Sequence, residues 1–458
     1  MFIFYDLETT GLKPAWDQIL QFAAIRTDNH LHVVEEVNIR SRLAPHILPS
    51  PEALNVTGIR TDRLNDPNLP NAFTFAQKMA DQIRRWTPGI WIGFNSMRFD
   101  EGFLRQAFYQ NLHPDVYATQ MNGNCRLDLL TAVYAAHIRE SAAVVIPVNG
   151  QGRPTFRLAG LASANGFEGH EAHDALGDVK AALHIARRMR ERRPALWADL
   201  LTNARKHRVV RKLADFRPVE VVCRPGSGVP RAFFGCLCGW SECNRSEAAI
   251  VDLDAADPET LFSADDDTLL AAITNEPRTI HPVAVNRAPA IFELTCPKPE
   301  HARKAEAIAN APEFRRRVGQ ALAARWPAVP KAQKPVEERI YESFYSRDDQ
   351  QLLRRFQVAR WPERSEIAAT LNDDRLRELG RRLIAAYSPD SSAPEDWARF
   401  RAETHGKWTD PDPLVPWMTS AQADAEIERL RLNDDADPTR LQEIKNFINM
   451  RMAKVNNV

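Results

Sequence analysis

The sequence predicts three parts in order: an α/β layer, a small β-rich domain and a helical region. Three observations support this prediction. Strand and helix patterns alternate up to about residue 195, short β-rich runs broken by Gly and Pro follow, and helical periodicity dominates from about Tyr341 onward. A chain of 458 residues is too long for one ordinary core, so we place the domains at 1–195, 196–345 and 346–458.

The first part begins with three strand patterns and continues with helices and one further strand. Aromatic and β-branched residues dominate the opening run, and the next two runs follow closely enough to form an antiparallel meander. The later segments have apolar residues at helical spacing, which is typical of helices that cover a sheet. The expected strands are 2–8, 18–28, 32–43 and 89–95, and the expected helices are 74–87, 99–112, 125–138 and 173–193.

The second part has short runs that are rich in β-forming residues. They lie at 219–226, 230–240, 248–254 and 279–294, and they predict a small β-barrel or sandwich. A helical connection is expected at 302–323, followed by a proline-containing linker at 325–340. Beyond this linker, the pattern is almost entirely helical.

Composition excludes some classes of function. Lys and Arg together number 60, as do Asp and Glu, so the net charge is zero and only a local patch could attract a polyanion. The sequence has no run of about 18 apolar residues, which would predict a membrane span, and its start does not resemble a signal peptide. We therefore expect a cytoplasmic protein, and a monomer because nothing indicates an oligomer.

Three of the six cysteines are close in sequence. Cys236, Cys238 and Cys243 have the spacing C-x-C-x4-C, without a matching Cys or His pair at the distance seen in zinc fingers. In a cytoplasmic protein, reduced thiols are the norm. Free thiols are therefore favoured over a structural metal.

Two carboxylates end the first strand pattern. Asp6 and Glu8 are two positions apart, so on a strand they point to the same face. Two like charges at the end of a buried strand are tolerable when a divalent cation neutralises them, and Mg²⁺ or Mn²⁺ would suit oxygen ligands. Helix capping or ion pairing is the alternative.

Further candidates follow in two later segments. Asp100 comes just after the strand at 89–95 and starts a helix, where it could be a metal ligand or an N-cap. His173 and Asp178 are five residues apart on one predicted helix. Asp178 could lie on a solvated face, but the neighbouring residues Ala181 and Ala182 favour close packing against the sheet.

These three motifs together resemble the DEDD superfamily of 3′→5′ exonucleases, in the branch with H-x4-D in the third motif. The resemblance implies an RNase H-like fold for the first domain. It also implies that Asp6, Glu8, Asp100 and Asp178 are metal ligands. His173 would be the general base, since an imidazole titrates near neutral pH; a buried structural histidine is the alternative.

Longer stretches resemble the bacterial exonuclease I family. These are "DLETTGLKP", "GFNSMRFDEGFL", "PTFRLAGLASANGFEGHEAHDALGDV" and "IYESFYSRDD". The resemblance implies an SH3-like β domain after the nuclease domain, then a helical domain. It implies hydrolysis of single-stranded DNA from the 3′ end to 5′-mononucleotides with two Mg²⁺ ions, for which Mn²⁺ can substitute, in DNA repair and recombination. The acidic tail of single-strand DNA-binding protein would be a partner.

The resemblance also suggests how the strand end is held. Backbone near Thr9 would reach the 3′-hydroxyl, Gly11 would allow close approach, and Leu12 would wedge against the last base or else be a core residue. Asn95, Arg98 and Phe99 lie beside Asp100 in sequence and are candidate phosphate or stacking contacts.

A basic run supports a nucleic-acid groove. From Arg187 to Lys212 there are ten Lys or Arg residues and two acidic residues, although such a run can be only a solvated helix face. The aromatic residues Phe233, Phe234 and Trp240 could stack bases, but a core role is favoured. The alternatives to a DNA exonuclease are an RNA-directed or proofreading enzyme of the same superfamily, or a silent nucleic-acid-binding module.

Overall fold

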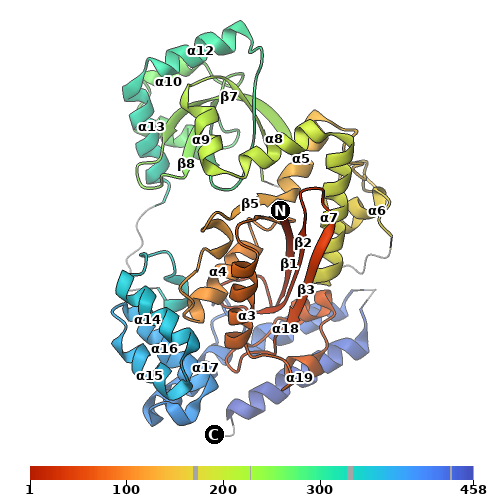
Figure 1. The fold of residues 1–458 in the computed structure, drawn as a ribbon, viewed down its shortest axis with the longest axis vertical. Helices are drawn as coiled ribbons and strands as arrows, with labels where there is room; N and C mark the ends of the chain where they lie inside the picture. The colour runs from red at the N-terminus through yellow and green to blue at the C-terminus, as the bar shows by residue number, and fades with distance from the viewer. Residues whose placement is uncertain (169–173, 227, 327–333, 434–435, 457–458) are drawn as a thin grey trace.

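The computed structural model describes residues 1–168, 174–226, 228–326, 334–433 and 436–456 (Figure 1). The β-rich domain lies at one end of the molecule, and the C-terminal helices lie at the other, around the first domain (Figure 1). No helix within the described ranges combines the length and apolar character that crossing a membrane would require.

A mixed five-stranded sheet is the centre of the first domain. Its strand order is β3-β2-β1-β4-β5, with β1, β2 and β3 antiparallel and with β4 and β5 parallel to β1. The predicted meander of the first three strands is therefore confirmed. The strands are β1 (Phe2–Thr9), β2 (Ile19–Thr27), β3 (Val33–Arg40), β4 (Ile90–Gly93) and β5 (Cys125–Asp128).

Alternate residues of β1 enter two different cores. Phe4 packs with residues of α5 and α7 on one face, whereas Ile3 and Tyr5 pack with residues of α3 and α4 on the other. The helices of this domain are α1 (Pro51–Thr57), α2 (Thr61–Leu64), α3 (Ala72–Arg85), α4 (Asp100–Gln110), α5 (Leu129–Arg139), α6 (Leu158–Ala164) and α7 (Ala175–Arg192). By the same alternation, Asp6 and Glu8 lie on the α7 face of the sheet.

The helix expected at 125–138 begins later than predicted. Its first four residues, Cys125–Asp128, are strand β5, which pairs in parallel with β4. Asp128 then serves as the N-cap of α5, because its side chain accepts a hydrogen bond from the backbone N–H of Leu130. The apolar residues of a short edge strand and of the helix after it form one continuous run, which periodicity alone does not divide.

The second domain contains one antiparallel sheet, of order β10-β6-β7-β8-β9. The expected β-rich region is present, and among the described residues its strands form one hydrogen-bonded sheet, so the choice between a barrel and a sandwich stays a prediction. The strands are β6 (Val219–Cys223), β7 (Arg231–Trp240), β8 (Glu247–Asp252), β9 (Ile280–Ala284) and β10 (Ala290–Glu293). The helices α8 (Pro194–Asn203) and α9 (Lys206–Ala214) lead into it from α7.

Helices cover this second sheet. The connection expected at 302–323 is two helices, α12 (Pro299–Ala309) and α13 (Pro312–Ala324), and a proline in the first turn of α13 separates them. Phe314 and Val318 of α13 share a core with Cys236 and Cys238 of β7, so α13 belongs to the domain itself. Two short helices, α10 (Pro258–Phe262) and α11 (Asp266–Thr274), were not expected.

The side chains singled out in this domain are largely structural. Cys236 and Cys238 are buried thiols in β7, whereas Cys243 is exposed. Phe233 is buried and stacks on His281 with ring centroids 4.3 Å apart, which supports the core interpretation. Phe234 and Trp240 are half-buried.

The C-terminal helices pack against the first domain and share its cores. Leu353 of α14, Ile367 of α15 and Leu376 of α16 join the core that contains Ile3 and Tyr5. Ile427 of α18 and Phe447 of α19 pack with the segment after β3 and with α1. The helices are α14 (Arg347–Val358), α15 (Trp361–Thr370), α16 (Asp374–Tyr387), α17 (Pro394–Trp408), α18 (Ser420–Arg431) and α19 (Pro438–Asn456).

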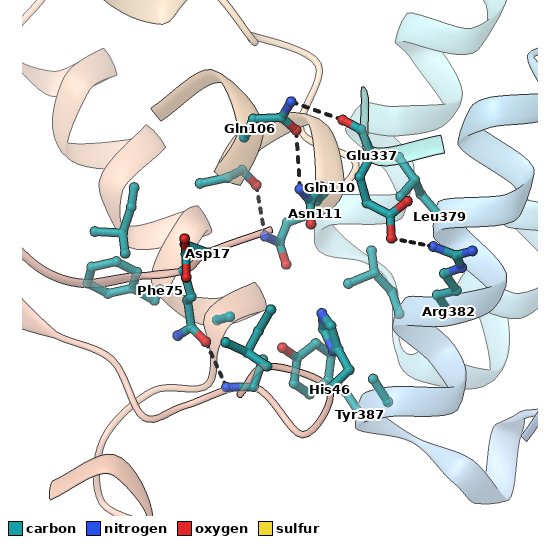
Figure 2. Close-up of a pocket in the computed structure, with 18 of the residues that line it drawn as sticks. Asp17, His46, Phe75, Gln106, Gln110, Asn111, Glu337, Leu379, Arg382 and Tyr387 are labelled. Carbon is teal, nitrogen blue, oxygen red and sulfur yellow. Dashed lines mark hydrogen bonds and ion pairs between the residues drawn. The ribbon is translucent and has the colours of Figure 1, made fainter. Parts of the chain in front are cut away.

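A cavity of about 100 Å³ lies where these helices meet the first domain (Figure 2). Glu337 dominates its polar wall: one carboxylate oxygen accepts hydrogen bonds from Arg382 (2.7 Å) and Lys407 (2.6 Å). The carbonyl of Glu337 also accepts a hydrogen bond from Gln106 of α4 (3.0 Å). A buried ionic cluster thus ties α16 and α17 to α4.

Candidate metal centre and active site

The end of β1 brings two carboxylates to one face of the sheet. Tyr5 and Leu7 point into the opposite core, so Asp6 and Glu8 share the face that α7 covers. Glu8 is 7% exposed, and Asp6 is half-buried. Strand geometry alone therefore determines that this pair lies side by side.

Helix α7 supplies the third carboxylate. The helix begins at Ala175, with Asp174 as its N-cap, two residues later than the predicted start. Asp174 also accepts hydrogen bonds from Gln21 of β2 (3.0 Å) and Arg40 of β3 (2.7 Å), which fixes the start of α7 over the sheet. Asp178 lies in the first turn that follows.

The expected packing of α7 against the sheet is confirmed, because Ala175, Ala181 and Ala182 are all buried. Small side chains allow the helix axis to approach the strands closely, and this brings the half-buried Asp178 toward β1. His173, the predicted general base, lies outside the described residues.

Three carboxylates converge as a result. One oxygen atom from each of Asp6, Glu8 and Asp178 lies within 4.8 Å of the others. Burial raises the pKa of Asp6 well above its usual range, and the charges of Asp100, Asp178 and Glu8 raise it further. Burial and the neighbouring acids raise the pKa of Glu8 to about 9. Three ionised groups cannot share this space without a compensating cation.

Asp100, the first residue of α4, is not one of the three carboxylates within 4.8 Å, but its charge acts on Asp6 and Glu8. Phe99, not Asp100, occupies the N-cap position, so the capping alternative is wrong. Asp100 is 3% exposed, and its Oδ1 is buried without a hydrogen-bond partner among the described residues. Burial, together with the charges of Asp128 and Glu101, raises its pKa to about 8.

The neighbouring residue Glu101 is equally buried but fully paired. It accepts hydrogen bonds from Arg126 (2.6 Å), Thr119 (2.8 Å) and Tyr5 (2.9 Å). Burial alone would raise the pKa of Glu101, but the positive charges of Arg126 and Arg105 outweigh it and the pKa is lowered. Of two consecutive buried carboxylates, Asp100 is therefore the one without a cationic partner among the described residues.

These observations fit a divalent metal centre. The four carboxylates supply only oxygen donors, which Mg²⁺ and Mn²⁺ prefer, and one buried oxygen of Asp100 has no partner in the described chain. The raised pKa values of Asp6, Glu8 and Asp100 have the same physical cause: burial among like charges. A cation bound here would lower all three.

The turn after β1 carries the first predicted substrate contacts. The Thr9 hydroxyl donates to the carbonyl of Gly11 (2.7 Å), and Leu12 is 79% exposed, which excludes a core role for Leu12. A Cβ at Gly11 would lie 2.5 Å from the carboxylate of Asp17, so packing within the turn already requires glycine here.

The loop after β4 carries the other predicted contacts. Asn95 and Arg98 are exposed, and Phe99 is half-buried against Phe103. The backbone N–H groups of Asn95 (2.9 Å) and Met97 (3.2 Å) donate to the carboxylate of Asp128. Because β1 and β4 are parallel, their following loops lie at the same edge of the sheet as the acidic cluster.

Asp128 is a positioning residue that sequence reasoning missed. Its carboxylate accepts from two N–H groups of the loop after β4 and from the N-terminus of α5. The available signal was an aspartate directly before an apolar helical pattern, which is typical of an N-cap. The helix predicted at 125–138 includes Asp128, so the sequence prediction gives Asp128 no N-cap role.

The basic run is only partly available to a ligand. Arg187 donates to the carbonyl of Leu31, and Arg193 pairs with Glu140 (2.7 Å). The exposed members Arg205 and Lys206 line a cleft of about 660 Å³ between the first domain and the β-rich domain. Arg205 and Lys206 therefore lie at a cleft where a groove is predicted, and its role in binding a nucleic acid stays a prediction.

Comparisons with known proteins identify related sequences and similar folds. Residues 3–186 match the family model of the RNase_T exonucleases. Exodeoxyribonuclease I of Escherichia coli is 30% identical over 373 residues, which are 76% of this chain and 77% of that protein.

Two solved structures have the same fold over nearly the whole chain. Escherichia coli exonuclease I in complex with a dA16 oligonucleotide aligns with a TM-score of 0.83 at 24% identity, covering 99% of each chain. A structure described as SSB/exonuclease I with an inhibitor aligns with a TM-score of 0.81 at 24% identity, also covering 99% of each chain.

Proposed function

This chain belongs to the exodeoxyribonuclease I family, and we propose that it hydrolyses single-stranded DNA from the 3′ end to 5′-mononucleotides. The main support is that Asp6, Glu8 and Asp178 converge within 4.8 Å, and that Asp100, whose charge raises the pKa values of Asp6 and Glu8, has a buried oxygen without a partner among the described residues. Such an activity would serve DNA repair and recombination, in the cytoplasm.

The four carboxylates would hold two Mg²⁺ ions, with Mn²⁺ able to substitute. Ions bound there neutralise charge on the scissile phosphate and acidify water at neutral pH. The residues contribute by position: β1 fixes Asp6 and Glu8, α7 fixes Asp178, and α4 fixes Asp100. His173 is proposed to accept the proton of the attacking water, since its imidazole suits that role near neutral pH.

The strand end would be held at the same sheet edge. Backbone near Thr9 and Gly11 would contact the 3′-terminal nucleotide, and the exposed Leu12 would wedge against the last base. Asn95, Arg98 and Phe99 would contact the neighbouring phosphates or bases. The hydrogen bonds from the loop after β4 to Asp128 support this role, because they pre-organise that loop.

We propose the domain division 1–195, 196–345 and 346–458, with an SH3-like second domain, acting as a monomer. The basic cleft lined by Arg205 and Lys206 lies between the first two domains, where a single strand would pass. The acidic tail of single-strand DNA-binding protein is the proposed protein partner, supported by the solved SSB/exonuclease I structure of a relative.

The test compares wild type with Asp6→Ala and with Asp81→Ala, a control that removes an exposed carboxylate on α3. Each protein is incubated with Mg²⁺ and with single-stranded DNA, duplex DNA or RNA, labelled at the 5′ or 3′ end. We expect stepwise shortening of 5′-labelled single-stranded DNA and release of mononucleotide from the 3′ label, by wild type and Asp81→Ala only.

Other outcomes would redirect the proposal. Faster cleavage of RNA would keep the exonuclease assignment and overturn the choice of substrate. Absence of Mg²⁺-dependent cleavage of every substrate would favour a silent nucleic-acid-binding module.

A further inference from the structure

A second cavity, of about 440 Å³, lies among the segment after β3 and the helices α16, α17 and α19. It adjoins the cavity of Figure 2, since Tyr387, Phe400 and Thr404 line both. None of the four clustered carboxylates lines it. Its volume is in the range of sites that enclose small organic ligands.

The charged side chains that line this second cavity are all positive. Four cationic side chains line it, and no carboxylate does. They are Arg42, Arg401, Arg451 and Lys454. Within the described parts of the chain, no ion pair to a carboxylate is found for Arg42, Arg451 or Lys454. A buried cation that meets no carboxylate among the described residues, such as Arg451, costs free energy, and a bound anion would recover part of it.

Arg451 is the most buried of these cations. It is 8% exposed, and its Nη2 donates to the carbonyls of Ala44 (2.8 Å) and Pro45 (3.0 Å). Its Nε is buried with no hydrogen-bond partner among the described residues. Burial lowers the pKa of Arg451 to about 10. This guanidinium is therefore held in place and incompletely satisfied.

Aromatic rings line the same cavity. Trp397 and Tyr387 are half-buried, and the guanidinium of Arg401 lies 4.7 Å from the ring centre of Trp397. Tyr387 and Arg42 line the same cavity. Burial raises the pKa of Tyr387, and the charge of Arg42 offsets part of that rise. Aromatic faces stack nucleobases, and guanidinium groups suit phosphate oxygens.

We propose that this cavity binds a nucleoside 5′-monophosphate, with the phosphate near Arg42 and Lys454 and the base against Trp397 or Tyr387. The origin of this ligand depends on the proposed function, because a 5′-mononucleotide is the product of the proposed hydrolysis. The cations line one cavity of about 440 Å³, a size that favours a small anion with a ring over an extended acidic peptide. The site lies apart from the acidic cluster and takes no part in hydrolysis.

Binding is measured directly, by calorimetric titration of dAMP, inorganic phosphate and deoxyadenosine into the full chain with EDTA present. Wild type is compared with the double variant Arg42→Gln/Lys454→Gln and with Trp397→Leu. The control for charge is Arg84→Gln, an exposed arginine of α3, and Asp6→Ala tests the contribution of the acidic cluster. Thermal unfolding verifies that each variant is folded.

We expect one dAMP site per chain, weakened at least tenfold by the double variant and by Trp397→Leu. Arg84→Gln and Asp6→Ala should stay within about twofold of wild type. Phosphate and deoxyadenosine should each bind more weakly than dAMP, because each makes half of the contacts. Hydrolysis of DNA by the double variant should keep its wild-type rate.

Three results would overturn the proposal. These are no saturable binding of dAMP at millimolar concentration, binding that the cavity variants leave unchanged, or binding that Asp6→Ala abolishes. An acidic peptide that binds in an Arg42-dependent way, where dAMP does not, would assign the cavity to a protein partner. Since no titration requires catalysis, failure of the exonuclease assignment would not be confused with failure of this site.

Discussion

Replacing Glu8 by Gln should stabilise the metal-free protein while it abolishes nuclease activity. Glu8 is 7% exposed and lies among Asp178, Asp100 and Asp174, whose charges add to burial in raising its pKa from 4.5 to about 9. An acid with a raised pKa keeps its proton in the folded state and loses it in the unfolded state. The contribution of Glu8 to the free energy of unfolding is therefore fully present below pH 4.5, and it is lost as the pH rises toward 9.

The magnitude follows from the size of the shift. At about pH 7.5, the three pH units above 4.5 correspond to roughly 4 kcal/mol at about 1.4 kcal/mol per unit. A buried amide at this position leaves part of its hydrogen bonding unmade, which costs about 1–3 kcal/mol. We therefore expect Glu8→Gln to gain on the order of 1–3 kcal/mol over wild type.

The assay is urea unfolding followed by circular dichroism in EDTA, at about pH 5.5 and about pH 7.5, with Glu306→Gln as an exposed control. The gain should be larger at the higher pH and absent in the control. Adding Mg²⁺ should stabilise wild type more than Glu8→Gln, because the variant binds the ion less well. A variant that is less stable than wild type in EDTA, or equally stable at both pH values, would refute the reasoning.

Three further predictions concern structure around the site. Arg126→Met leaves Glu101 buried without its closest cation. The variant should lower the free energy of unfolding, measured in denaturant titrations, by about 3–5 kcal/mol. Adding Glu101→Gln to this variant should restore part of the loss. The pKa of the buried His113 is lowered from 6.5 to about 4, mainly by burial, so its contribution to stability should be lost below pH 6.5, by about 2 kcal/mol at about pH 5. Because the raised pKa of Glu8 acts in the opposite direction, the loss is measured as the difference in stability between wild type and His113→Gln, and a difference that stays constant between about pH 5 and 6.5 would contradict this. Gly11→Ala places a Cβ 2.5 Å from the carboxylate of Asp17, so the turn after β1 should shift. We expect this shift to raise KM for single-stranded DNA. An unchanged KM would show that this turn does not contribute to substrate binding.

The local features of the acidic cluster follow from sequence. A two-residue spacing on a strand places Asp6 and Glu8 on one face whatever the rest of the fold does. Small residues around Asp178 indicate a helix close to the sheet, and α7 packs in that way. Such inferences succeed because they depend on periodicities of a few residues, which the chain carries locally.

Other features depend on partners that are distant in sequence. Asp100 and Glu101 look alike as consecutive acids, but only Glu101 meets Arg126, 25 residues away. The carboxylate of Asp128 accepts a hydrogen bond from the loop after β4, 33 residues away. The helix predicted at 125–138 includes Asp128, so this role was not predicted. Hydrogen bonds of this kind are decided by strand order and register, which no local pattern specifies.

The sequence by itself determined most of the strand and helix types, the acidic motifs and the exonuclease family, but not β5, α10 or α11. Only the tertiary structure decided which acid stays unpaired, how the C-terminal helices share cores with the first domain, and where Arg42, Arg451 and Trp397 meet around one cavity. The physical reason is that the partners that compensate a charge, and the side chains that line a cavity, come from segments tens to hundreds of residues apart, and only packing brings these segments together.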